Sequence, residues 1–215
     1  MKKNTFMRVA SALLVAVLLT TCAIAGTFAK YTTSKESTDT ARVAKWGVNI
    51  QVAVDGAFAT EYEADATDYT ASANTVVSSG TDNLLAPGTS GDLLANATIS
   101  GTPEVAVRVT KVATLELTGW VVDGDFYCPL VITVDGTPIK GTDYDSATEF
   151  IAAVEARLDG VKDYEPNTNL AESHVVTWEW AFEGDNEKDT ALGNAAVAGD
   201  ITIAFALSIT VEQIN

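Results

Sequence analysis

Apolar and polar residues alternate along several segments of this chain, and this period of two indicates β-strands with one buried face. The longest such segments are residues 46–54, 105–117, 126–134, 176–182 and 201–211. Turns separate them, and no regular alternation of strand and helix runs along the chain. The sequence therefore predicts a mainly-β fold, an antiparallel jelly roll or β-sandwich that spans residues 45–215 and contains one or two short inserted helices.

Single residues within these segments predict local details of strand pairing. Lys111 interrupts the apolar parity of its strand, so we expect a bulge or an edge position near it. The Asp123-Gly124 pair predicts the turn of a hairpin whose second strand covers residues 126–134. Cys128 shares the parity of the apolar residues of that strand, which predicts that its thiol lies in the core.

Helical and loop signals occupy the stretches between the strands. Ser146 and Glu149 form a capping box, and the apolar stripe that follows them predicts a helix that ends near Gly160. Residues 189–197 are compatible with a second, short helix. Residues 57–82 are acidic and rich in Ala, Thr and Ser, which predicts a surface loop with a weak strand at residues 75–77.

The N-terminus has the layout of a secretory signal peptide. Basic residues precede an apolar run from Val9 to Leu19, and small residues follow it. Two cleavage sites compete, one after Ala25 and one between Ala29 and Lys30, and the polar residues 30–44 predict an extended arm. An uncleaved membrane anchor and a lipoprotein modified at Cys22 are the alternatives.

The net charge of the chain excludes some classes of binding partner. Removal of residues 1–29 takes away three of the 13 basic residues and none of the 29 acidic ones, which leaves a formal charge of −19. Such a chain repels nucleic acid and anionic lipid, so we expect no nucleic-acid partner and no contact with a membrane beyond the signal peptide. One cysteine remains after cleavage, so no intramolecular disulfide can form.

The residue types that perform chemistry are sparse. His174 is the only histidine, and it lacks the spacing of a catalytic triad or a zinc site, so we expect it to be structural or exposed. The aromatic residues Trp178, Trp180 and Phe182 share one parity. This parity favours a face packed in the core over a platform that stacks against sugars. We therefore expect no enzymatic activity, no catalytic residues and no cofactor.

An acidic loop offers one weak metal candidate. Its acidic side chains recur at every second position and could supply oxygen ligands to calcium, although the loop lacks the glycine and the final glutamate of an EF-hand. These residues are Glu183, Asp185, Glu187 and Asp189. They support an alternative function, a monomeric surface-binding module or adhesin that depends on calcium.

Three separated motifs resemble the TasA/camelysin family of proteins secreted by Gram-positive bacteria. The first is Gly26-Thr27-Phe28-Ala29-Lys30-Tyr31, which is followed by the polar arm and by residues 41–48, ARVAKWGV. The second is the turn Leu85-Ala86-Pro87-Gly88. The third is the final segment, residues 205–215, FALSITVEQIN. Because the motifs occur at both ends and in the middle, the resemblance covers the whole chain after residue 29.

The resemblance implies a function as well as a fold. It implies cleavage between Ala29 and Lys30 by a signal peptidase of the SipW type, a jelly-roll domain, and a self-assembling subunit of extracellular biofilm fibres. In such fibres the arm of one subunit pairs as a strand with the next subunit. Here the arm would be Tyr31 to Val43, with Tyr31, Thr32, Ala41 and Val43 as its candidate contact residues. The alternative is that the arm pairs within its own subunit or stays disordered. The camelysin branch has been associated with metallopeptidase activity, a second alternative function, but this sequence carries no recognisable zinc-ligand set.

Overall fold

The computed structural model describes residues 14, 41–53, 56–63, 74–198 and 201–215. The signal peptide and most of the arm, including Ala29, Lys30, Tyr31 and Thr32, lie outside the described residues. The chain divides into two units, Met1–Val43 and Ala44–Asn215. The second unit contains all the strands found among the described residues, and its first residue is one position before the expected start of the domain.

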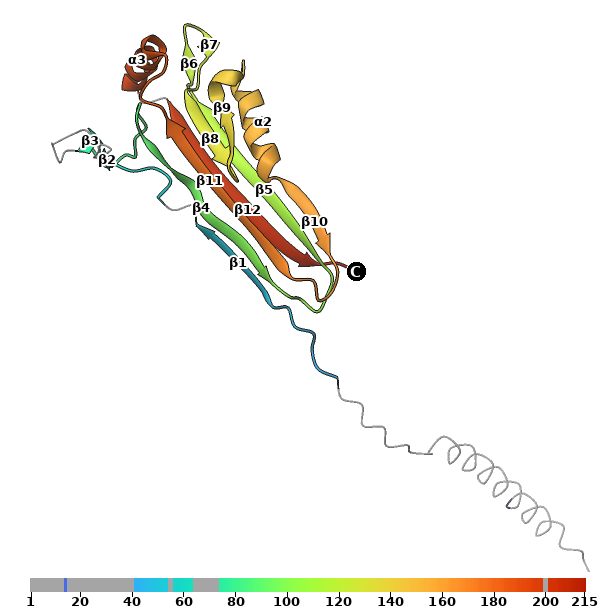
Figure 1. The fold of residues 1–215 in the computed structure, drawn as a ribbon. Helices are drawn as coiled ribbons and strands as arrows, with labels where there is room; N and C mark the ends of the chain where they lie inside the picture. The colour runs from blue at the N-terminus through green and yellow to red at the C-terminus, as the bar shows by residue number, and fades with distance from the viewer. Residues whose placement is uncertain (1–13, 15–40, 54–55, 64–73, 199–200) are drawn as a thin grey trace, which may run out of the picture. The chain divides into compact units, whose positions relative to one another are not determined.

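The second unit is an antiparallel β-sandwich (Figure 1). The larger sheet has five strands in the spatial order β1 (Val48–Ala53), β4 (Ser90–Gly101), β11 (Leu170–Trp180), β8 (Leu130–Val134) and β9 (Thr137–Lys140). The smaller sheet has three strands in the order β10 (Gly160–Tyr164), β5 (Val107–Thr118) and β12 (Thr202–Gln213). The prediction of a mainly-β sandwich with short inserted helices is confirmed.

The core lies between the two sheets and forms two clusters. The larger cluster joins Leu94 of β4, Leu115 of β5 and Trp178 of β11 to the buried face of α2 (Ala147–Leu158). The smaller cluster joins residues at the other end of the same strands: Ile99, Val107, Val109, Tyr164 and Leu170. Helix α2 begins at the predicted capping box, where the Ser146 hydroxyl accepts a hydrogen bond from the Glu149 amide at 3.3 Å.

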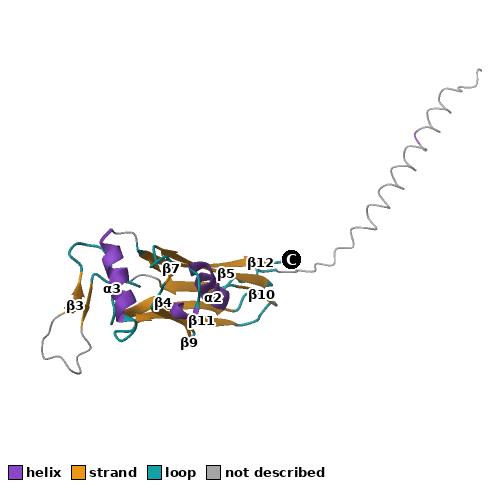
Figure 2. Ribbon diagram, turned by 90° about the horizontal axis from the view of Figure 1, so that it is seen from above, coloured by secondary structure: helices purple, strands orange, loops and turns teal. Residues whose placement is uncertain are grey.

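Two small hairpins and a second helix complete this unit. Helix α3 (Asn186–Ala195) and the hairpin of β2 (Glu61–Glu63) and β3 (Asn74–Val77) lie at the end of the sandwich opposite the C-terminus (Figure 2). Strands β6 (Val121–Val122) and β7 (Asp125–Phe126) form the hairpin predicted from Asp123-Gly124. Both turn residues have positive φ, 54° and 94°, as a tight hairpin turn requires. Short 3-10 helices occupy Gly141–Asp143 and Ala196–Ala198.

The structure corrects four details of the sequence analysis. Lys111 lies in the central strand of the smaller sheet and causes no bulge, because β12 pairs continuously past it; β10, however, ends opposite Lys111, so β5 has no strand partner on that side beyond this residue. The segment 126–134 is not one strand, because β7 ends at Phe126 and β8 begins only after Pro129, which has no N–H to donate. Phe182 lies beyond β11 and is 71% exposed. The alternating face of β1, expected to be buried, is only partly buried.

Candidate functional site

Strands β1 and β12 form the edges of the two sheets on one side of the sandwich. Within the described residues, β1 pairs only with β4, and β12 pairs only with β5. The two strands come into contact across the sandwich but do not pair with each other. Because alternate residues of an edge strand direct their N–H and C=O groups away from the sheet, this side presents backbone groups that could pair with a further strand.

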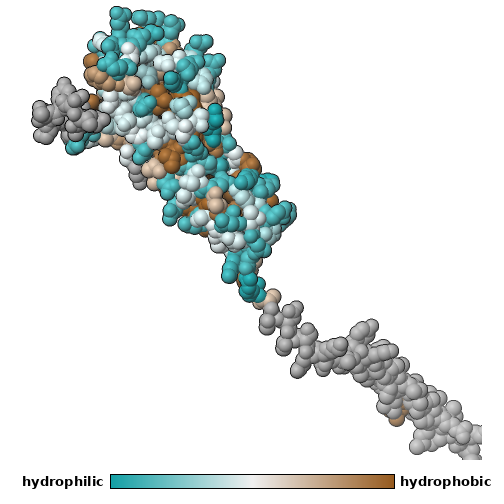
Figure 3. Space-filling view, in the orientation of Figure 1, coloured by the Kyte–Doolittle hydropathy of each residue, from teal (hydrophilic) through white to brown (hydrophobic). Residues whose placement is uncertain are grey.

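The side chains between these two edges are apolar and incompletely covered. Ile50 and Val52 of β1 keep 37% and 38% of their surface exposed. Alternate residues of β12 are only half-buried, although they pack against the core: Ile203, Phe205, Leu207, Ile209 and Val211. We use the term seam for Val48, Ile50 and Val52 of β1 together with these five residues of β12. Figure 3 shows hydrophobic patches in brown that interrupt the polar surface of this unit.

In contrast, the opposite edge of the smaller sheet is covered by β10 and α2. Strand β10 pairs with β5 only as far as Lys111. Beyond Lys111, two side-chain carboxylates, one from α2 and one from its C-terminal cap, accept hydrogen bonds from β5 in place of a neighbouring strand. Asp159 Oδ1 accepts from the Ala113 amide at 2.6 Å, and Glu155 Oε1 accepts from the Leu115 amide at 3.0 Å. These side chains satisfy backbone donors that would otherwise lie unpaired under the helix. The seam is therefore the open side of a sandwich whose other side is capped.

The edge strands also differ in length. Strand β9 has four residues, including Pro138, and β10 has five, so both are poor templates for a further strand. Strand β12 has 12 residues. Natural proteins keep free edges short or interrupted, because a long regular edge invites pairing with another chain. Strand β12 is neither short nor interrupted, which singles it out as a pairing edge.

The chain enters the sandwich beside the seam. The Lys45 amide donates to Glu104 Oε2 at 2.8 Å, and the Glu104 amide donates to the Lys45 carbonyl at 2.9 Å. Of the predicted arm residues, Ala41 and Val43 are described, and both are exposed and outside any strand. The structure therefore shows where the ordered domain begins, while pairing by the arm stays a prediction.

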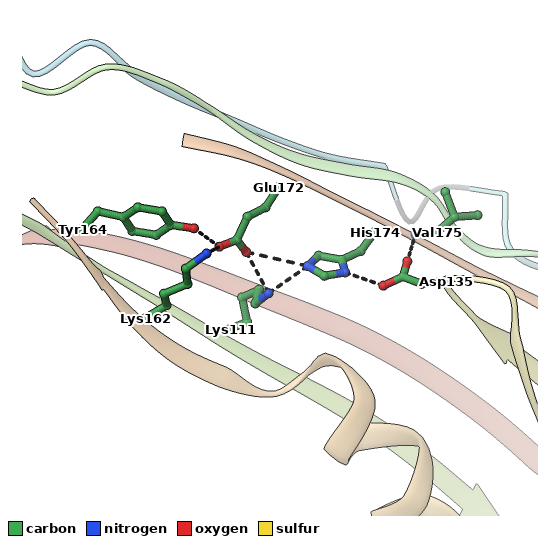
Figure 4. Close-up of polar contacts among 7 residues, drawn as sticks. All are labelled: Lys111, Asp135, Lys162, Tyr164, Glu172, His174 and Val175. Carbon is green, nitrogen blue, oxygen red and sulfur yellow. Dashed lines mark hydrogen bonds and ion pairs between the residues drawn. The ribbon is translucent and has the colours of Figure 1, made fainter. Parts of the chain in front are cut away.

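A layer of charged side chains separates the two core clusters (Figure 4). Lys111 of β5 reaches across to β11, where its Nζ lies 2.8 Å from Glu172 Oε2 and 2.8 Å from His174 Nε2. Tyr164 donates its hydroxyl hydrogen to Glu172 Oε1, and Lys162 lies 3.6 Å from the same oxygen. Lys111, Glu172 and His174 are each only 13–15% exposed, so this layer joins the two sheets within the interior.

The His174 ring is held by the Asp135-Gly136 turn between β8 and β9. Its Nδ1 lies 2.7 Å from Asp135 Oδ2, and Asp135 Oδ1 accepts from the Val175 amide at 2.9 Å. Because an ammonium group can only donate, the contact with Lys111 makes Nε2 the acceptor and leaves the hydrogen on Nδ1, facing Asp135. The structural role expected for His174 agrees with these contacts. The register shift in β11 falls at His174–Val176, beside this turn.

Glu172 is the electrostatic centre of this layer. Burial opposes its ionisation, but the hydrogen bonds from Lys111 and Tyr164 and the charges of Lys111 and Lys162 outweigh burial and lower its pKa to about 2. The same contact acts in the opposite direction on Tyr164, whose pKa is raised by burial and by its hydrogen bond to Glu172. Sequence reasoning did not bring these residues together. The available signal was the shared inward parity of Glu172, His174 and Val176, together with the charge of Lys111 on an apolar face.

The candidate calcium residues have separate roles in the structure. Asp185 is the N-cap of α3, where its Oδ1 accepts from the Lys188 amide at 3.1 Å. Asp189 is buried, and its Oδ1 accepts from the Tyr127 hydroxyl at 2.7 Å. Glu183 and Glu187 are exposed. No group of three or more His, Cys, Asp or Glu side chains in the described part of the chain is placed to hold a metal ion. Calcium binding stays an untested hypothesis.

Comparisons with known proteins add no further assignment. No protein-family model, no curated protein and no solved structure matches this chain. The resemblance to the TasA/camelysin family therefore rests on the motifs alone. Among the described helices, none has the length and apolar character needed to cross a bilayer.

Proposed function

We propose that this protein is a secreted structural subunit that assembles into extracellular fibres of the biofilm matrix. In this proposal the signal peptide is removed between Ala29 and Lys30 by a peptidase of the SipW type. The arm thus released lies as an added strand in the seam of the next subunit. The observation that carries the proposal is the seam, because β1 and β12 have the alternating sequence of strands with a buried face, yet the isolated chain leaves that face partly exposed.

The dimensions of the arm fit the seam. At a rise of about 3.3 Å per residue, the 15 residues 30–44 extend to roughly 50 Å, and the 12 residues of β12 extend to roughly 40 Å. One arm is therefore long enough to pair along the whole of β12 and to leave a few residues as a connection. Because donor and acceptor surfaces differ, each added subunit presents a new seam, and such a head-to-tail contact continues as a filament.

Charge also favours this pairing. The arm holds the basic residues Lys30, Lys35 and Arg42 and the acidic residues Glu36 and Asp39, a net charge of +1. Since three further basic residues lie in the signal peptide, residues 45–215 retain seven of the 13 basic residues and 27 of the 29 acidic ones, a net charge of −20. A slightly basic strand is attracted to a strongly acidic domain, whereas two such domains repel each other without it.

Removal of the arm tests the proposal directly. A chain that begins at Lys30 should form filaments visible by electron microscopy, and a chain that begins at Lys45 should stay monomeric with unchanged β-sheet circular dichroism. Filaments formed equally well by the shorter chain would refute strand addition by the arm. A chain that begins at Lys30 and stays monomeric under all conditions would favour the binding-module alternative.

A charge placed in the seam tests the acceptor side. Ile50→Lys puts an ammonium group on the exposed inner face of β1, where an added strand would bury it, so we expect filament growth to fall at least tenfold. The matched control is Val161→Lys on β10, an exposed apolar residue on an edge strand of the closed side. Both variants should fold as monomers because both positions are already exposed. Equal filament growth by the two variants would exclude the seam as the acceptor.

A further inference from the structure

A pocket of about 410 Å³ lies between α3 and the start of β12. This volume is within the range of small-molecule sites. Its wall is mainly apolar and aromatic, and none of its lining residues carries a charge: the lining includes Phe58, Leu85, Trp120, Trp180, Leu192 and Ile203. In a chain with 29 acidic residues, an uncharged wall of this size disfavours ions and selects neutral ligands.

One buried polar group in this wall has no partner. The indole N–H of Trp180 is buried and meets no acceptor within the described residues. The other buried tryptophans differ from it. Trp120 Nε1 donates to the Thr202 carbonyl at 2.8 Å, and Trp178 Nε1 donates to the Ala57 carbonyl at 2.8 Å. A buried donor without an acceptor is unfavourable, and a ligand that supplies an acceptor would relieve it.

We propose that this pocket binds an uncharged aromatic molecule that carries a carbonyl or ether oxygen. The rings of Trp120 and Trp180, whose centroids lie 6.1 Å apart at an interplanar angle of 50°, provide aromatic surface for the apolar body of the ligand. Trp180 Nε1 donates to the oxygen of the ligand after a small movement of the indole ring. The pocket meets the seam at one residue, Ile203, and its other described lining residues lie outside the seam.

Gly193 offers a way to close the pocket without disturbing the fold. It lines the pocket from α3, and a Cβ added to it would meet no atom within 4 Å. Gly193→Phe therefore adds a ring at the wall of the pocket without a clash at Cβ, and it also removes a helix-weakening glycine. Asn194→Phe is the matched control, because it adds the same ring at the next, exposed position of α3, which does not line the pocket.

The experiment measures binding of 6-propionyl-2-dimethylaminonaphthalene, a neutral naphthyl ketone whose emission shifts to shorter wavelength in apolar sites. The purified protein should bind it with a blue shift and with quenching of tryptophan fluorescence. We expect Gly193→Phe to weaken binding at least tenfold and Asn194→Phe to leave it unchanged. No binding by the unaltered protein, or equal binding by it and by Gly193→Phe, would overturn the site.

A second comparison isolates the indole N–H. Trp180→Phe removes this donor and keeps an aromatic wall, so we expect about tenfold weaker binding of the ketone. The carbonyl-free analogue, 2-dimethylaminonaphthalene, should change by less than about threefold, because it has no acceptor to lose. Equal weakening of both probes would show that Trp180 contributes shape alone and would overturn the proposed recognition of an oxygen.

Discussion

Glu172→Gln tests how much the charged layer between the two core clusters stabilises the fold. The substitution preserves the shape of the side chain and an oxygen acceptor for Tyr164, but it removes the negative charge 2.8 Å from Lys111 Nζ. Lys111 is then left with its positive charge in a site that is only 15% exposed. The other contact of the ammonium group within the described residues is His174 Nε2, which is not an anion.

The magnitude follows from the pKa of Glu172. A fall from the ordinary value of 4.5 to about 2 corresponds to roughly 3.4 kcal/mol at 1.36 kcal/mol per pKa unit. Solvent that reaches the partly exposed carboxylate screens this interaction, so we expect about 2 kcal/mol. Since the pKa is lower in the folded chain than in the unfolded chain, this stability is fully present above about pH 4.5. It is lost as the pH falls towards 2.

Urea denaturation of the two proteins at several pH values measures this effect. At about pH 7 the unfolding free energy of Glu172→Gln should lie about 2 kcal/mol below that of the unaltered protein, and the gap should close as the pH falls from about 4.5 to about 2. Glu179→Gln, the same change at an exposed position of β11, should leave the midpoint unchanged. A gap below about 0.5 kcal/mol at pH 7, or one that persists undiminished at low pH, would refute this account of Glu172.

Two further predictions concern the core and the entry to the seam. Burial raises the pKa of the Cys128 thiol to about 12. This thiol should therefore resist alkylation at about pH 8 in the folded protein and react once urea unfolds the chain. Rapid labelling of the folded protein would contradict the burial of Cys128. Gly101→Ala should lower the unfolding free energy by at least about 2 kcal/mol, because Gly101 has a φ of 127° and an added Cβ would lie 1.9 Å from the Gly47 carbonyl oxygen. Gly80→Ala, where an added Cβ meets no atom within 4 Å, is the control, and equal thermal midpoints for the two variants would contradict the predicted clash.

Local patterns in the sequence were sufficient for much of the fold. The alternation of β5 and β12, the capping box of α2 and the Asp123-Gly124 turn each act over a few residues, and the structure contains all of them. Cys128 is buried as predicted, but it lies between β7 and β8, and Tyr127 beside it is buried too, so strand parity is not the cause of its burial. In contrast, β9, β10 and the first half of β11 were not predicted, because their sequences lack a continuous apolar face and they form strands through pairing with distant neighbours.

The charged layer could not be derived from the sequence, although its members carried signals. The charge of Lys111 on an apolar strand face predicts a bulge or an edge position, because it has no partner within its own segment. The partner, Glu172, lies 61 positions away on the opposite sheet. Only the packing of the two sheets brings the two side chains together, and this pairing allows a charge to remain in the interior without breaking the strand.

The sequence by itself determined that β1 and β12 have one face suited to burial, because the alternation of side chains depends only on neighbouring positions in an extended chain. Whether another strand covers that face depends on contacts between segments far apart in the chain. The tertiary structure decided this point: α2 and β10 close one side of the sandwich, while the seam between β1 and β12 stays open. Alternation shows which surface a strand can bury, and only the arrangement of the sheets shows which surface remains available to a partner.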